Sequence, residues 1–312
     1  MPTVAVTGAG GYVGGRLVQY LRSEGVVVRP MVRRPVPWLP DALVADLAAE
    51  EPVATAQHLA GCDAVVHLAG PNEVLAARDP DGSTAATVAA ARRVAVAALI
   101  AGVARAVHLS TIHVYGAALE RGGLVDEAVL PAPRHPYAVA RLAAEHLMAS
   151  TGVDLVVLRL TNSVGAPVDP RVDRWTLVAM ELATEAAAGR PIVLRSSGRQ
   201  WRDFIDLGDA CRTLARAATG IVPPGTYNLG SGRSTTILDL AHLLADEAGR
   251  DGVRPPVVAP DHDGPPPAPV RVGIERLAAH VPRPEVPLGA SLRELVDLCR
   301  RGPGAGVGTS GG

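Results

Sequence analysis

The fold is decided near the start of the chain by TVAVTGAGGYVGG at residues 3–15. A short β-branched run leads directly into glycines at positions 8, 11 and 14, and a helix-like stretch follows. Glycines at this spacing permit a tight turn, close approach of the backbone to a pyrophosphate, and close packing of helix on strand. The helix N-terminus adds N–H donors and partial positive charge. We therefore expect a dinucleotide to contact Gly8, Gly11, Tyr12 and Val13.

The same rhythm continues through the first half of the chain. Short, almost continuously apolar runs alternate with alanine-rich stretches. Strands covered on both faces are expected to be apolar throughout, and a repeated β–α–β order predicts a doubly wound parallel sheet of the α/β class. The expected strands are residues 3–7, 26–32, 42–44, 64–68, 106–110 and 155–159, and the expected helices are residues 13–23, 87–102 and 137–150.

The alternation of strand-like and helix-like stretches becomes less regular after Asn162, which predicts a second, smaller domain. We expect residues 1–162 to form the dinucleotide-binding domain, with return segments near 202–231, and residues 163–300 to form the substrate-binding portion. Residues 301–312, RGPGAGVGTSGG, have the composition of a disordered tail. Within the second domain the pattern predicts a helix at 175–189, a strand at 192–194, a strand and a helix around 227–249, and an irregular proline-rich stretch at 255–269.

Composition excludes several kinds of partner. The 312 residues are 48% apolar and 20% charged, enough for a sizeable core, and the net charge of −1 gives no basic field for nucleic acid or an anionic membrane. We see no basic-then-apolar leader and no apolar run of the ~18 residues that a membrane span needs. Three widely spaced cysteines argue against a disulfide framework or a cysteine-rich metal site. We expect a cytoplasmic protein without a metal.

The ends of the next strands bear on the choice of cofactor. The second strand ends in Arg33 and Arg34 instead of the acidic residue that would hold an adenosine ribose diol. The planar fork of arginine suits a 2′-phosphate, which favours NADP over NAD, although two solvated loop arginines are the alternative. Asp46, beside Leu47, follows the third strand, where a carboxylate can accept from the adenine amino group. The small residues of Leu68-Ala69-Gly70 leave room for the cofactor after the fourth strand.

Several motifs then occur in one order along the chain: TGAGGYVG, VVHLAG, HLSTIHVYG, HPYAVAR, VLRLTNSVG, WRDFIDLGD and YNLGSG. With these motifs the chain resembles the extended short-chain dehydrogenase/reductase family, in its NAD-dependent epimerase/dehydratase group, over roughly residues 3–298. The resemblance implies a Rossmann fold with a smaller C-terminal substrate-binding domain. It also implies nucleotide-sugar chemistry by transient or net hydride transfer.

By this resemblance Tyr137 is the acid/base and Thr111 hydrogen-bonds the reacting oxygen. A tyrosine removes a proton from a sugar hydroxyl only if its pKa falls from about 10 toward 7, which needs about 4 kcal/mol of preferential stabilisation of the phenolate. A nearby cation and the charge of the oxidised nicotinamide can supply it. Ser110 is a weaker candidate for substrate contact. His113 stands where subgroups differ and either touches substrate or is structural.

Arg141 takes the place of the family's lysine, four residues after Tyr137 and so on the same helix face. An arginine stays charged and can reach a ribose diol, but it cannot release a proton near neutral pH. All thirty Lys and Arg residues of this chain are arginine, so drift under codon pressure explains the change as well as function does. We expect retained catalysis, with a cofactor-binding protein that does not turn over as the alternative.

The substrate half carries fewer matches. Asn162 and Arg202 resemble the family's contacts to the substrate diphosphate, and a salt bridge of Arg202 with Asp203 or Asp206 is the alternative. The family's asparagine opening the helix after the fourth strand is replaced near Thr87. A later arginine is missing from HDGPPPAP, and Arg271 is the candidate to substitute for it.

The alanine-rich helices at 88–101 and 137–150 resemble those that pair in the dimers of this family, so we expect a homodimer. The function expected first is that of an NAD(P)-dependent nucleotide-sugar epimerase. An NADPH-dependent nucleotide-sugar 4-ketoreductase is the alternative, and a catalytically silent NADP-binding regulator is the alternative of another class.

Overall fold

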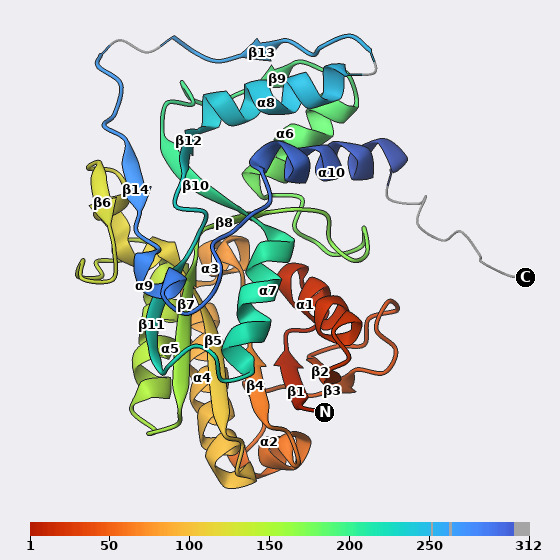
Figure 1. Cartoon of the computed structure of the whole chain (residues 1–312), viewed down its shortest axis with the longest axis vertical. Coiled ribbons are helices and arrows are strands. Elements are labelled where there is room, and N and C mark those ends of the chain that lie inside the picture. Colours follow the sequence, from red (N-terminus) through yellow and green to blue (C-terminus); the bar gives the residue numbers. More distant parts are fainter. Residues whose placement is uncertain (251, 262–263, 303–312) are drawn as a thin grey trace, which may run out of the picture.

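A seven-stranded sheet, parallel throughout, forms the larger half of the molecule (Figure 1). The structure is a computed structural model, described here for residues 1–250, 252–261 and 264–302. The strand order is β11-β7-β5-β4-β1-β2-β3, so the chain runs outward from β1 in both directions. The strands are β1 (Thr3–Thr7), β2 (Val27–Val32), β3 (Leu43–Val44), β4 (Ala64–His67), β5 (Arg105–Thr111), β7 (Leu155–Leu160) and β11 (Gly225–Leu229).

Helices cover both faces of this sheet because successive strand residues point to opposite sides. In β1, Val4 and Val6 pack with helices α1 (Tyr12–Ser23) and α7 (Leu207–Ala218). Ala5, between them, faces the other core. The helices on that side are α2 (Pro52–Leu59), α4 (Pro80–Ala101) and α5 (Pro136–Ala149). The predicted doubly wound Rossmann-like sheet is therefore confirmed.

The smaller half lies beyond the carboxyl ends of the strands (Figure 1). Its largest sheet has the order β12-β10-β8, and two-stranded pairs β13-β9 and β14-β6 lie beside it. Its elements are β6 (Gly123–Val125), β8 (Asn162–Val164), α6 (Val178–Ala187), β9 (Ile192–Val193), β10 (Trp201–Asp206), β12 (Ser234–Thr236), α8 (Ile237–Gly249), β13 (Val257–Val258), β14 (Val270–Val272), α9 (Glu275–Ala278) and α10 (Leu288–Arg301).

The predicted return of the chain near residues 202–231 is made by α7 and β11. Helix α7 packs against α1, and β11 pairs with β7 in the large sheet. Strand β10 does not return, because it pairs with β8 and β12 in the small sheet. The division into domains at residue 162 stays a prediction, and the predicted tail at 301–312 falls outside the described residues from 303 onward.

Two predicted helix starts and one predicted irregular stretch were wrong. Helix α4 begins at Pro80 rather than residue 87, because the Asp79 side chain accepts a hydrogen bond from the Gly82 N–H and Pro80 suits the first helical position. Helix α6 begins at Val178 rather than residue 175. The proline-rich stretch at 255–269 is not wholly irregular, because β13 pairs with β9 there.

Helix α4 bears on the expectation that no apolar run is long enough to span a membrane. By length and composition alone its 22 residues, which include Arg92 and Arg93, could cross one, and it is the one helix of the described residues of which this is true. The core helix of a globular protein can have the same length and composition, and α4 packs against α2 and α5 through buried residues such as Ala91, Val94 and Ala98. The apolar character of α4 therefore has a sufficient explanation in the core.

Candidate active site

A cavity of about 610 Å³ lies at the carboxyl ends of the parallel strands, between the two halves of the molecule. This is the edge at which open α/β sheets bind ligands. Residues from the glycine-rich turn, from the ends of β4, β5 and β7, from α5 and from the loop before α6 line it. Among the predicted site residues it is lined by Gly8, Gly11, Tyr12, Val13, Leu68, Gly70, Ser110, Thr111, His113, Tyr137, Arg141 and Asn162.

The glycine-rich turn has the shape that a dinucleotide cradle needs. Gly8 has a φ of +69°, and a Cβ there would lie 2.9 Å from the backbone nitrogen of Ala69. A Cβ on Gly14 would lie 2.1 Å from the carbonyl oxygen of Gly8, so helix α1 can pack this closely on the turn only with glycine. No side chain caps α1 at Gly11. The first N–H groups of α1 are therefore open to an anion.

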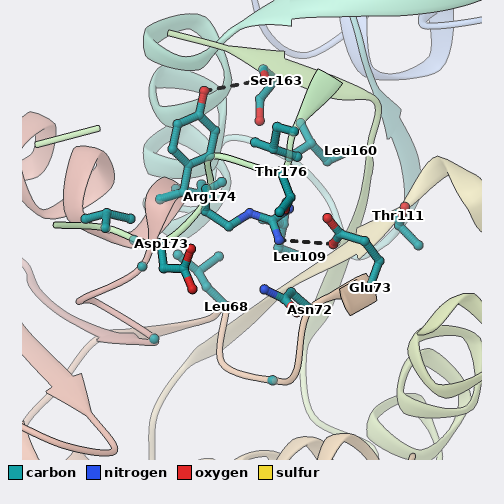
Figure 2. A pocket seen from close by; sticks show the side chains of 18 of the residues that line it. Leu68, Asn72, Glu73, Leu109, Thr111, Leu160, Ser163, Asp173, Arg174 and Thr176 are labelled. Atoms are coloured by element: carbon teal, nitrogen blue, oxygen red, sulfur yellow. Dashed lines mark hydrogen bonds and ion pairs between the residues drawn. The ribbon is translucent and has the colours of Figure 1, made fainter. Parts of the chain in front are cut away.

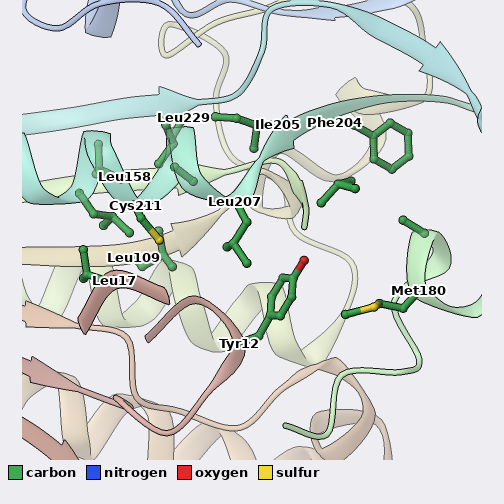
Figure 3. Packing of buried hydrophobic residues seen from close by; sticks show 14 of the residues in the cluster. Tyr12, Leu17, Leu109, Leu158, Met180, Phe204, Ile205, Leu207, Cys211 and Leu229 are labelled. Carbon is green, nitrogen blue, oxygen red and sulfur yellow. The ribbon is translucent and has the colours of Figure 1, made fainter. Parts of the chain in front are cut away.

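Tyr12 contributes to this turn through its backbone, because its side chain is buried (Figure 3). The phenol hydroxyl donates a hydrogen bond of 2.8 Å to the carbonyl oxygen of Gly165. Burial raises the pKa of Tyr12 well above its usual value, so the hydroxyl stays protonated. Tyr12 thus ties the first helix to the loop after β8.

The residues predicted to read the adenosine end do not line the cavity. Arg33 and Arg34 are exposed. Asp46 accepts a hydrogen bond of 3.1 Å from the Ala48 N–H, and Leu47 is buried in the core on the α2 and α4 side. Their cofactor contacts stay predictions.

Val36 and Trp38, which sequence reasoning missed, line the cavity instead. A Cβ on Gly10 would lie 3.1 Å from the Val36 side chain, which shows how closely the loop after β2 covers the turn. The proline on each side of Val36 was the one signal that this loop is stiff.

Tyr137 and Arg141 come from the first turns of α5 and face the cavity with Thr111 from the end of β5. The guanidinium carbon of Arg141 lies 5.3 Å from the centre of the Tyr137 ring. Arg141 is 6% exposed, and its Nη1 donates to the carbonyl oxygen of Leu109 at 3.3 Å. Among the described residues no carboxylate pairs with it. Its charge is therefore uncompensated beside the phenol.

Space for this arginine comes from Gly70. A Cβ on Gly70, which has a φ of +148°, would lie 3.1 Å from Nη2 of Arg141. Gly70 therefore makes room for Arg141, while its contact with the cofactor stays a prediction.

Two buried histidines, His67 of β4 and His108 of β5, lie side by side in the sheet close to Arg141. They are register partners, and their ring centres are 5.4 Å apart. Burial lowers the pKa of His67 to about 3 and that of His108 well below its ordinary value, and the charge of Arg141 adds to both shifts. Both rings are therefore neutral at pH 7. They add no positive charge beside Arg141.

Ser110 lines the cavity, but its hydroxyl is committed elsewhere. It donates a short hydrogen bond to Glu145, which also forms a buried ion pair with Arg159 at 2.7 Å. Arg159 Nη1 donates to the Tyr115 hydroxyl at 2.9 Å, and that hydroxyl donates to Asn228 at 2.9 Å. This buried network supports the β5 end from behind. A substrate contact of Ser110 stays a prediction.

A second cavity of about 350 Å³ adjoins the first and shares Glu73, His113 and Tyr137 with it. Arg202 lines only this second cavity. Its Nη1 donates to the carbonyl oxygen of Trp201 at 2.8 Å, and the alternative salt bridge with Asp203 or Asp206 is not formed. Burial lowers the pKa of Arg202, and burial, Arg202 and His135 lower that of His113. Glu120 lines the same cavity, and its charge partly offsets the effect of burial on Arg202, but no carboxylate among the described residues forms a salt bridge with this guanidinium, which suits an anionic ligand.

Asn162 and Arg271 were the other candidates for the substrate diphosphate. Asn162 lines the first cavity, and its Nδ2 donates to the carbonyl oxygen of Asp203 at 2.9 Å. Arg271 lies on an exposed face, where it pairs with Glu275 at 3.9 Å. Arg271 therefore does not take the place of the missing arginine in either cavity.

The loop at residues 165–177 forms a wall of the first cavity on the side of the smaller half. Arg174 pairs with Glu73 across the cavity at 3.1 Å (Figure 2). Arg171 pairs with Asp169 through two hydrogen bonds of 2.7 and 2.8 Å and lies 5.2 Å from the Trp38 ring centre. Sequence reasoning missed these residues because the loop has no periodic pattern, and the Arg174–Glu73 pair joins residues about a hundred positions apart.

A parallel sheet with a glycine cradle, and a phenol and a cation at the same edge, define a dinucleotide-dependent enzyme of the Rossmann type. The chain belongs to the NAD dependent epimerase/dehydratase family, whose model matches residues 4–230. The resemblance seen in the motifs is therefore confirmed.

The chain is similar to enzymes named for nucleotide sugars and to structures solved with NAD or NADPH. The chain is 32% identical to a dTDP-6-deoxy-L-talose 4-dehydrogenase (NAD(P)⁺) of Kitasatospora kifunensis, over 84% of each chain. The UDP-glucose 4-epimerase of Thermus thermophilus, solved with NAD, is 26% identical with a TM-score of 0.78. A protein named RMD from Pseudomonas aeruginosa, solved with NADPH, is 27% identical with a TM-score of 0.78. Each of these two matches covers 96% of this chain and 99% of the other.

Proposed function

We propose that the protein is an NAD(P)-dependent nucleotide-sugar epimerase that removes a hydride from a sugar carbon, C4 in our assignment, and returns it to the opposite face. One observation carries the proposal. Tyr137 lines both cavities, so its phenol stands between the glycine cradle and the space that holds the half-buried guanidinium of Arg202. A sugar whose diphosphate is bound by Arg202 could present a hydroxyl to Tyr137.

The residues of the site have separate roles in this chemistry. Tyr137 takes the proton of the sugar hydroxyl and gives it back. Thr111 donates a hydrogen bond to the same oxygen, and the charge of Arg141 favours the phenolate. Gly8 and Gly11 hold the cofactor pyrophosphate on the open N–H groups of α1. The bound nicotinamide would supply the hydride acceptor and donor.

The loop at 165–177 supports epimerisation over net reduction. An epimerase keeps its cofactor through the reaction, and this loop, which forms one wall of the first cavity, would slow its escape. The 4-ketoreductase remains the second candidate. It is supported by the 4-dehydrogenase relative and by the exposed Arg33 and Arg34, which could reach the 2′-phosphate of NADP.

The cofactor test is to purify the protein and determine the absorbance and mass of any bound nucleotide. Tightly held NAD is expected for the epimerase, and loosely held NADPH would favour the reductase. The double variant Arg33→Ala/Arg34→Ala should weaken NADP binding by about 10-fold and leave NAD binding unchanged. Equal loss for both cofactors would exclude a 2′-phosphate contact.

The activity test is a panel of UDP-, dTDP- and GDP-sugars assayed for epimerisation and, with NADPH, for reduction of 4-keto sugars. Tyr137→Phe is run alongside as the inactive control. Turnover by the wild type that Tyr137→Phe loses supports the proposal. Cofactor binding without turnover on any sugar would favour the regulator.

We also propose that the protein is a cytoplasmic homodimer. The outward face of α4 and α5 exposes Leu99, Ile100 and Val139, at 47%, 54% and 44%. Their small neighbouring alanines permit helices of a second copy to approach closely. Sedimentation should give a dimer for the wild type and a monomer for Ile100→Glu/Val139→Glu. A monomeric wild type would contradict this part.

A further inference from the structure

The ion pair between Arg174 and Glu73 lies inside the first cavity rather than on its rim. Arg174 belongs to the loop before α6, and Glu73 is the first residue of α3 (Glu73–Arg78), which follows β4. The two side chains therefore come from opposite walls, and Nη1 of Arg174 reaches Oε2 of Glu73 at 3.1 Å. Figure 2 shows the guanidinium in the middle of the cavity. A ligand that fills the cavity must meet this pair.

An anionic ligand can readily replace the Glu73 carboxylate in this ion pair. The pair has a single short contact, and the side chains of Arg174 and Glu73 are 20% and 43% exposed. Partly exposed pairs of this kind contribute little to stability. Arg171 on the same loop differs, because Asp169 already binds its guanidinium through two parallel hydrogen bonds. Arg174 can therefore donate more N–H groups to a ligand than Arg171 can.

The other arginines that line the first cavity, Arg141 and Arg171, are each engaged elsewhere. Arg33 and Arg34 do not line it, and Arg271 is turned outward to Glu275. Arg141 lies beside the phenol of Tyr137. The glycine cradle offers backbone N–H groups, which leaves most of the charge of a pyrophosphate uncompensated.

We propose that Arg174 is a pyrophosphate-binding arginine, which Glu73 holds in position until a ligand arrives. The inference rests on the proposed function and adds a binding residue to it. A pyrophosphate displaces the carboxylate because it carries more charge and offers oxygens on both phosphates to the arginine fork. The pyrophosphate can be that of the dinucleotide or that of the sugar nucleotide. In either case binding would release Glu73.

Calorimetric titration of the full chain tests this with NAD⁺ and NADP⁺ in one arm and UDP, dTDP and GDP in the other. Arg174→Met should weaken binding of the relevant ligand by about 10- to 100-fold. Glu73→Gln, which keeps Arg174 but removes its competitor, should bind severalfold more tightly. Arg190→Met removes an arginine paired with Glu185 outside the cavity and should bind as the wild type does.

The two arms identify the source of the pyrophosphate. Loss confined to the dinucleotides assigns Arg174 to the cofactor, and loss confined to the nucleoside diphosphates assigns it to the substrate. Unchanged affinities for both classes in Arg174→Met and Glu73→Gln would overturn the inference and leave the proposed function standing. A wild type that binds neither class would overturn both.

Discussion

The guanidinium carbon of Arg141 lies 5.3 Å from the centre of the Tyr137 ring, with the side chain fixed against Gly70 and the Leu109 carbonyl. A buried cation with no carboxylate partner among the described residues has its field directed at the phenol. This arrangement is the one that the proposed electrostatic role of Arg141 requires. It gives arginine a physical reason to stand at this position, besides the lack of lysine in the chain.

Arg141→Lys tests whether the charge is what matters. We expect kcat/KM to stay within about 10-fold of the wild type or to rise, because the cation is kept. Arg141→Met should lower kcat/KM by about 100-fold or more, because the cation beside the phenol is lost. Both are measured as pH–rate profiles. Equal activity of the Met and Lys variants would show that the charge does not act on the reaction.

Tyr137→Phe should lower kcat by about 10²- to 10⁴-fold, because the proton acceptor is removed. Its affinity for the dinucleotide should remain within about twofold, since Gly8, Gly11 and the α1 N-terminus are unchanged. Single-turnover kinetics and cofactor titration separate the two effects. A variant that loses cofactor affinity as strongly as turnover would assign Tyr137 to binding alone.

Glu145→Gln tests the buried network behind Ser110. The change leaves the guanidinium of Arg159 buried without its counter-charge, and such losses cost about 3–5 kcal/mol in the free energy of unfolding. Urea unfolding measures it. Glu185→Gln, which breaks the exposed pair with Arg190, is the matched control and should unfold as the wild type does. If the two variants are equally stable, the buried pair contributes nothing.

The stacked histidines predict loss of stability in acid. In the folded protein the pKa of His67 is lowered to about 3 and that of His108 lies well below 6.5. Below pH 6.5 the unfolded chain therefore binds protons that the folded chain does not. The free energy of unfolding then falls by about 1.4 kcal/mol per pH unit for a ring that the folded protein keeps neutral, or about 2 kcal/mol at pH 5 for His67.

His108→Leu should reduce the fall in stability between pH 7 and pH 5, because the unfolded chain then has one ring fewer that gains a proton there. Urea unfolding at the two pH values measures the difference. His146→Gln, which changes an exposed histidine on α5, should keep the wild-type fall. The interpretation is wrong if His108→Leu and the wild type lose equal stability.

The sequence by itself determined the parallel sheet, the glycine cradle and the spacing of Tyr137 and Arg141, because these depend on short-range patterns. Strand burial appears as apolar runs, helix faces as a period of 3.6 residues, and the cradle as fixed glycine spacing. The family motifs also predicted Thr111 and Arg202 as site residues, and these line the first and the second of the two adjoining cavities. These features can be predicted without knowing which loops contact one another.

Only the tertiary structure decided which side chains face the cavities. Arg33, Arg34 and Asp46 stand at the expected strand ends but do not line the cavity, because Val36 and Trp38 cover the turn there. The contacts of Arg174 with Glu73 and of Tyr12 with Gly165 join residues about 100 and 150 positions apart. Such contacts follow from how the two halves pack, and packing of irregular loops has no period for a sequence to display.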